Sequence, residues 1–164
     1  MNDNKLYLSI LLKQIGSGLK PHGFSRKAGT FTRKSGDQFH FINVQSSMST
    51  TAHLLKFTIN LSIYSEAINQ LFEPGDDIGC RGWLDNHWQR RIGSLNGGTQ
   101  DLWWTVTTED DAHRYGAEVA NLIASDGLSE FDRYCSTRTL LAYTAAASSG
   151  FQAERARTAL ERFP

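Results

Sequence analysis

Cysteine is scarce in this chain of 164 residues, which contains only Cys80 and Cys135. The two residues are isolated and form no Cys-x-x-Cys pair. Such usage is typical of a reducing compartment, because proteins exported to oxidising environments rely on disulfides. We therefore expect two free, buried thiols rather than a disulfide.

Long apolar runs are also missing. No segment approaches the run of about 18 apolar residues that a membrane-spanning helix needs. The opening residues Met1-Asn2-Asp3-Asn4-Lys5 lead into a mixed segment, whereas a secretory signal has a basic region followed by an apolar one. The sequence predicts a cytoplasmic protein with no membrane partner.

Excess charge of either sign is absent, since 17 Lys and Arg balance 17 Asp and Glu. Overall neutrality argues against a dedicated nucleic-acid or polyanion binder. The balance nevertheless hides an asymmetry, because residues 1–50 are basic on balance and residues 51–164 are acidic.

No spacing in the chain dictates a chemistry. The five histidines are scattered, no pair has the spacing of metal ligands on one helix face, and no Gly-x-Ser-x-Gly elbow is present. Gly16-Ser17-Gly18 closes a predicted helix, whereas a phosphate-binding loop opens one. We expect no metal, no cofactor and no enzymatic activity. An enzyme whose site is assembled only by the fold remains an open alternative.

The clearest pattern present is the alternation of residues 55–64, Leu-Lys-Phe-Thr-Ile-Asn-Leu-Ser-Ile-Tyr. Every odd position is apolar and every even one is more polar, which is the period of a strand with one buried face. Burial of the five apolar side chains supplies about 10 kcal/mol of gross stabilisation. We predict that this segment is the central strand of an antiparallel sheet.

The rest of the chain suits elements packed around that strand. Leu8, Leu12, Ile15 and Leu19 form one face of a helix that Asn4 can cap. Short β-prone pieces within residues 24–34 and a longer one at 38–48 indicate a meander. Asn96-Gly97-Gly98 favours a hairpin between strands at 83–95 and 101–106. Thr107 and Thr108 begin a helix that Asp126-Gly127 ends. Ser136 caps a further helix, and 151–163 forms a solvated C-terminal one.

These elements predict an α+β fold. It consists of an antiparallel β-sheet, arranged as a meander, with an N-terminal helix and C-terminal helices packed on one face. The length is that of a single domain covering residues 1–164.

Two surfaces are candidates for binding. Thr58, Asn60 and Ser62 form the even face of the central strand, with Asn43 and Gln45 beside them. Such a row suits either a partner-facing surface or the solvent side of a half-covered sheet, and we favour the solvent side. A second cluster brings Arg90-Arg91 near Trp103-Trp104, where a guanidinium stacked on an indole locks the hairpin.

Basic residues interleaved with Phe24 and Phe31 form an alternative phosphate-binding surface. Its members are Lys20, Arg26, Lys27, Arg33 and Lys34. The competing interpretation is a solvated edge hairpin, because charged residues on an edge strand prevent aggregation. A nucleic-acid or nucleotide-binding module is therefore the alternative function.

Several blocks, taken in order, resemble a bacterial family known as domain-of-unknown-function family 4304. They are Leu19-Lys20-Pro21-His22-Gly23-Phe24, Thr30-Phe31-Thr32-Arg33, Phe41-Ile42-Asn43-Val44-Gln45, residues 57–64, Arg91-Ile92-Gly93-Ser94-Leu95, Asp101-Leu102-Trp103-Trp104 and Gly127-Leu128. The similarity covers residues 5–145 and depends on their order. Where the family's late block tends to have Leu-Pro, this chain has Leu128-Ser129. The resemblance implies an α+β domain and no catalytic residues.

By analogy, small single-domain proteins of this kind are often immunity proteins encoded beside polymorphic or contact-dependent toxins. We therefore expect a protein that binds and neutralises a cognate toxin domain. If that toxin is a basic nuclease, acidic residues are the natural contacts. The candidates are Glu73, Asp76, Asp77, Glu109, Asp110 and Asp111. Charge reversal at Asp76 and Asp77 is then expected to slow toxin capture without affecting folding.

Overall fold

A computed structural model describes residues 2–75, 82–99, 101–147 and 151–162 of the chain. In these residues the strands form one antiparallel sheet in the order β1-β2-β3-β4-β5, and β6 also pairs with β4. The strands are β1 (Ser25–Lys27), β2 (Thr30–Ser35), β3 (Gln38–Ser46), β4 (Leu55–Ser65), β5 (Trp88–Arg91) and β6 (Trp104–Val106). The predicted α+β fold with an antiparallel meander is confirmed.

The predicted central strand is β4, which pairs with three other strands. Its odd residues Leu55, Phe57, Ile59, Leu61 and Ile63 are all buried in the hydrophobic core. The alternating pattern therefore identified both the strand and its core-facing side.

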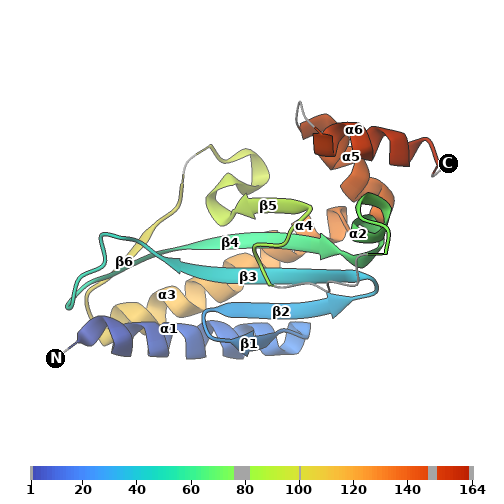
Figure 1. Cartoon of the computed structure of the whole chain (residues 1–164). Coiled ribbons are helices and arrows are strands. Elements are labelled where there is room, and N and C mark those ends of the chain that lie inside the picture. The colour runs from blue at the N-terminus through green and yellow to red at the C-terminus, as the bar shows by residue number, and fades with distance from the viewer. Residues whose placement is uncertain (1, 76–81, 100, 148–150, 163–164) are drawn as a thin grey trace.

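Helices α1 (Asp3–Leu19) and α3 (Glu109–Leu122) lie side by side against one face of the sheet (Figure 1). A 3₁₀ turn, η1 (Lys20–His22), follows α1. Asn4 was expected to cap α1 but lies inside it, since the helix begins one residue earlier. The Asn4 side chain instead donates a hydrogen bond to the Thr51 carbonyl oxygen in the β3–β4 connection.

Small residues allow α1 and α3 to approach closely. A Cβ atom on Gly116 of α3 would lie 2.6 Å from Cβ of Gln14, and one on Gly18 of α1 would lie 2.6 Å from Cβ of Ala120. Cβ atoms in real structures essentially never approach another non-bonded atom this closely. The glycines of the Gly16-Ser17-Gly18 segment thus belong to a helical interior and a helix contact.

The predicted helix stop at Gly127 is wrong. α3 continues through a π-helical segment, η3 (Ile123–Gly127), into α4 (Leu128–Arg133). Gly127 keeps helical dihedral angles, and a Cβ atom there would lie 3.2 Å from the Ile123 side chain. A glycine that packs against the preceding turn can remain in a helix. A π-helical turn, with its hydrogen bonds from i to i+5, accommodates an extra residue there.

The predicted hairpin between residues 83–95 and 101–106 is also wrong. β5 is followed by a 3₁₀ segment, η2 (Ile92–Gly97), and β5 and β6 each pair with β4 at different positions along its edge. Asn96 and Gly97 do adopt the expected positive φ values of 52° and 77°. The prediction of a turn at Asn96 and Gly97 is therefore confirmed. The two strands do not pair with each other, because β4 is long enough for both to pair with it.

The remaining helices α2 (Glu66–Phe72), α5 (Thr137–Ala147) and α6 (Phe151–Leu160) gather at one end of the sheet (Figure 1). Ser136 caps α5 as predicted, since its hydroxyl oxygen accepts a hydrogen bond from the Thr139 amide at 3.1 Å. α6 is not simply solvated, because Ala153 and Ala156 are fully buried. Among the described residues, no helix has the length and apolarity needed to cross a membrane.

Candidate interaction surface

The polar face of the sheet is buried, so the predicted solvent side is wrong. Thr58 and Asn60 are 0% and 2% exposed. Asn43 lies opposite Asn60, and Gln45 lies opposite Thr58. The Asn60 amide donates to Gln45 Oε1 at 2.8 Å, and the Asn43 amide donates to Thr30 Oγ1 at 3.0 Å. The amide side chains therefore satisfy one another and neighbouring hydroxyls instead of water.

The segment that leads into β5 crosses this face of the sheet, and the segment that leads into β6 runs down beside β4 (Figure 1). The Ser62 hydroxyl donates to the Trp83 carbonyl oxygen at 3.0 Å, and the Thr58 hydroxyl donates to the Leu102 carbonyl oxygen at 2.7 Å. Residues near 83 and 102 are thus fixed above β4. The hydroxyls on the even face hold two covering segments in place.

Trp103 lies above this face between two cations. Lys56 Nζ is 5.7 Å and Arg91 Cζ is 5.4 Å from the ring centroid of Trp103. Arg91 also forms an ion pair with Asp101, and Leu102 is 37% exposed. We call Lys56, Arg91, Asp101, Leu102 and Trp103 the Trp103 surface. The predicted stacking of an arginine on an indole is confirmed for Arg91, whereas the contribution of Lys56 was not expected.

The acidic candidates are not brought together. Glu73 follows α2 at the C-terminal end of β4, whereas Glu109, Asp110 and Asp111 begin α3 next to β6, which pairs with the N-terminal end of β4. The 11 residues of β4 separate these positions by about 35 Å at the rise of an extended strand. Asp76 and Asp77 lie outside the described residues. The acidic candidates therefore belong to two separate surfaces.

Asp111 has a structural role in the helix start. Its Oδ2 atom accepts hydrogen bonds from the Thr107 amide at 3.1 Å and the Thr107 hydroxyl at 3.0 Å, and its Oδ1 is paired with Arg114. The bonds from Thr107 are the main cause that lowers the Asp111 pKa to about 2. Glu109 and Asp110, by contrast, are exposed.

The basic candidates are divided between the two faces of the sheet. The pairing places Arg26 opposite Phe31 and Lys27 opposite Thr30, so that the two side chains point to opposite faces. Lys34 is ion-paired with Glu66 at 3.4 Å, and Lys20 is exposed in η1. Because Arg33 points into the helix-covered face, these residues do not form one continuous basic groove.

Arg33 belongs to a chain of partly buried hydrogen bonds. Its Nη2 donates to His40 Nδ1 at 2.9 Å, so the His40 proton is on Nε2, which donates to Gln38 Oε1 at 3.0 Å. Gln38 Nε2 then donates to the Tyr134 carbonyl oxygen at 3.0 Å. Burial, followed by the neighbouring guanidinium, lowers the His40 pKa to about 4. The chain joins β2 and β3 to the end of α4.

Cys135 is the cysteine that the described part of the chain contains. Cys135 is free as expected, but it is exposed rather than buried because it follows the end of α4. Cys80 lies outside the described part of the chain. Within that part, no group of three or more His, Cys, Asp or Glu side chains is placed to hold a metal ion.

A known protein family matches most of the chain. The family model for domain of unknown function DUF4304 matches residues 15–133. The chain belongs to the DUF4304 family. The DUF4304 match spans the sheet, the covering segments and the Trp103 surface, and it ends at the last residue of α4. Helices α5 and α6 lie beyond it. No curated protein and no solved structure matches the chain.

Proposed function

We propose that this protein is an immunity protein that binds one bacterial toxin domain and blocks it by protein–protein contact in the cytoplasm. It needs no reaction of its own for this role. The observation that carries the proposal is the Trp103 surface. It presents the Trp103 indole and exposed Leu102 on a fixed segment, beside Lys56 of β4 and Arg91 of β5.

The composition of this surface suits a binding hot spot. Trp and Arg are the residue types that most often dominate interface energies, and exposed apolar area next to them strengthens the contact. Arg91 and Lys56 approach the Trp103 ring at distances typical of cation–π contacts. Arg91 is already paired with Asp101, so a partner carboxylate can bind Lys56 while an apolar group covers the indole.

The surface is also preformed. The Thr58–Leu102 hydrogen bond fixes the segment before Trp103, and Trp104 stacks on buried Phe57 with ring centroids 5.2 Å apart. Binding to an ordered segment costs less conformational entropy than binding to a flexible loop. Such a site supports tight binding without a large rearrangement.

The toxin as partner comes from the analogy with immunity proteins, and co-expression tests it. Any toxin-like C-terminal domain that a neighbouring gene proves to encode is expressed with the protein, and their complex is isolated and its Kd measured. We expect Trp103→Ala to weaken the complex by about 2 kcal/mol, roughly 30-fold in Kd. Met48→Ala is the matched control, because Met48 is a fully exposed apolar residue in the β3–β4 connection.

Two outcomes would contradict the proposal. If the toxin domain fails to bind the native protein, the partner is wrong. If Trp103→Ala and Met48→Ala bind equally well while both remain folded, the Trp103 surface is not the contact.

The acidic contacts remain a separate prediction. Glu109 and Asp110 are exposed and adjacent, so reversing both charges tests them without disturbing the Asp111 cap. For a basic toxin we expect slower association and a weaker salt dependence, because long-range attraction mainly sets the association rate. An unchanged association rate would remove this pair from the interface.

The nucleic-acid alternative receives less support. The basic candidates point to both faces of the sheet, and Arg33 is bonded to His40 and to the His22 carbonyl oxygen. Filter binding at low and moderate salt distinguishes the two functions, because phosphate contacts make affinity fall steeply with salt.

A further inference from the structure

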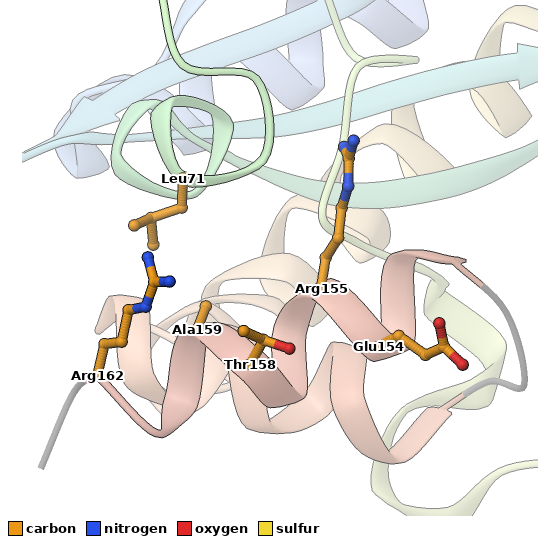
Figure 2. Close-up of a pocket in the computed structure, with 6 residues that line it drawn as sticks. All are labelled: Leu71, Glu154, Arg155, Thr158, Ala159 and Arg162. Atoms are coloured by element: carbon orange, nitrogen blue, oxygen red, sulfur yellow. The ribbon is translucent and has the colours of Figure 1, made fainter.

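A pocket of about 370 Å³ lies between α2 and α6 (Figure 2). Its volume is within the range of small-ligand sites, roughly 300–1,000 Å³. The lining residues are Leu71, Glu154, Arg155, Thr158, Ala159 and Arg162. All of them except Leu71 follow residue 133, where the DUF4304 match ends. The pocket is therefore an addition of this chain to the part that the family model describes.

Helical spacing brings the two arginines to the same side of the pocket. Arg155, Ala159 and Arg162 are separated by four and three residues, which places them on one face of α6 and its C-terminal turn. Figure 2 shows the Arg155 and Arg162 side chains extending from this side, with Arg162 reaching toward Leu71, whereas Glu154 points elsewhere. The two cations mark the two ends of the pocket.

The region between the arginines is less polar. Leu71 from α2 and buried Ala159 provide apolar contacts there, and Thr158 adds a hydroxyl group. Seven residues along a helix span about 10 Å. Two guanidinium groups at this separation suit a longer molecule better than one small ion. Arginine stays protonated at every physiological pH and binds carboxylate or phosphate with paired hydrogen bonds.

We propose that this pocket binds an organic dianion, a molecule whose two carboxylate or phosphate groups are joined by a short apolar body. Arg155 and Arg162 bind the two anionic ends, and Leu71 and Ala159 contact the middle. The Glu154 carboxylate at the rim opposes binding of anions. This inference does not depend on the proposed toxin-binding function.

Calorimetric titration with simple probes tests the proposal. Suberate, a straight-chain dicarboxylate, and hexane-1,6-diphosphonate present the two kinds of anionic end, while octanoate has the apolar body and one carboxylate. We expect at least one of the dianions to bind, and octanoate to bind at least about tenfold more weakly, because one charged hydrogen-bonded contact is lost. The dianion that binds more tightly identifies the carboxylate or phosphate class.

Variants of the pocket provide the second part of the test. Arg155→Gln and Arg162→Gln are each expected to weaken dianion binding by about tenfold. Glu154→Gln is expected to leave it unchanged or to tighten it. Arg26→Gln is the matched control, because Arg26 is an exposed arginine in β1. Circular dichroism and thermal unfolding verify the fold of each variant, and Arg162 lies beyond the end of α6, where substitution leaves the core intact.

Three results would overturn the proposal. They are no heat of binding with either dianion, equal binding of octanoate and the dianions, and a loss in Arg26→Gln as large as in the pocket variants.

Discussion

His40 illustrates how one buried side chain makes stability depend on pH. Its Nδ1 accepts a hydrogen bond from Arg33, so a proton there would break this bond and place two positive charges together. The pKa is about 4 in the fold and 6.5 for an ordinary histidine. The unfolded chain therefore binds more protons between these values. His40 should lower the free energy of unfolding by about 2 kcal/mol as the pH falls from 7 to 5.

Burial also lowers the pKa of His87 to about 4, and its Nδ1 accepts a hydrogen bond from the Ser65 amide at 3.0 Å. Urea unfolding at several pH values measures the combined effect. His40→Gln should reduce the slope of the free energy of unfolding against pH between pH 6.5 and 4. The slope that remains comes from His87. In the native protein, the NMR signal of the His40 ring should not titrate above pH 5. A ring that titrates near pH 6.5 would contradict both expectations.

The sequence could identify the charge of Arg33 but not its role. β-prone residues predicted strands within residues 24–34 and 38–48, yet the partner of Arg33 depends on the pairing that places it opposite His40. Nothing local distinguishes this arginine from Arg26, which is exposed on β1. For the same reason no partner of Lys56 was predicted, since its contact with Trp103 joins positions far apart in the chain.

At the level of elements, the α1–α3 contact gives a prediction with an unusual sign. Replacing glycine by alanine inside a helix normally stabilises it by roughly 0.5–1 kcal/mol. At Gly116 the new Cβ atom would lie 2.6 Å from Cβ of Gln14 and 3.3 Å from the Leu11 carbonyl oxygen. We expect Gly116→Ala to destabilise the protein by about 1–3 kcal/mol, because the helices must separate.

Chemical denaturation measures this effect, and Asn121→Ala is the control, since Asn121 is an exposed position of the same helix. The control should be neutral or slightly stabilising. If Gly116→Ala proves as stable as the native protein, α1 and α3 do not approach as closely as described.

Periodicity predicted the elements that have one apolar face. The core side of β4 and the helix with Leu12, Ile15 and Leu19 followed from spacing alone. The continuation of α3 through η3 did not, because Asp126-Gly127 has the composition of a helix end and only packing against Ile123 keeps Gly127 helical. The pairing of β5 and β6 with β4 was missed because turn residues show where a chain bends, not which edge the next strand joins.

For the whole molecule, balanced charge predicts low solubility near neutral pH. The sequence pI is about 7.0, and the basic first third and acidic remainder can attract one another between molecules. We expect a solubility minimum near pH 7 at low salt and an increase on adding salt, which screens the attraction. Light scattering across pH and ionic strength measures it. Solubility independent of both would show that the two charge groups do not meet between molecules.

The overall architecture was predictable, but the covering of the polar face was not. Amide and hydroxyl side chains on one side of a strand normally indicate solvent exposure. Here Thr58 and Ser62 instead bind carbonyl oxygens at Leu102 and Trp83, positions 44 and 21 residues away. Such long-range contacts leave no periodic signal, so the Trp103 surface could be inferred only in part, from the expected Arg91 stacking.

The pairing of α1 with α3 has a consequence during synthesis on the ribosome. The Tyr7 hydroxyl donates to the Thr107 carbonyl oxygen, 100 residues later, and α1 packs against α3 beyond that point. At about 5–20 residues per second, the apolar side of α1 waits roughly 5–20 s for its partner helix to be translated. Nascent chains of this protein should therefore engage chaperones until α3 emerges from the exit tunnel.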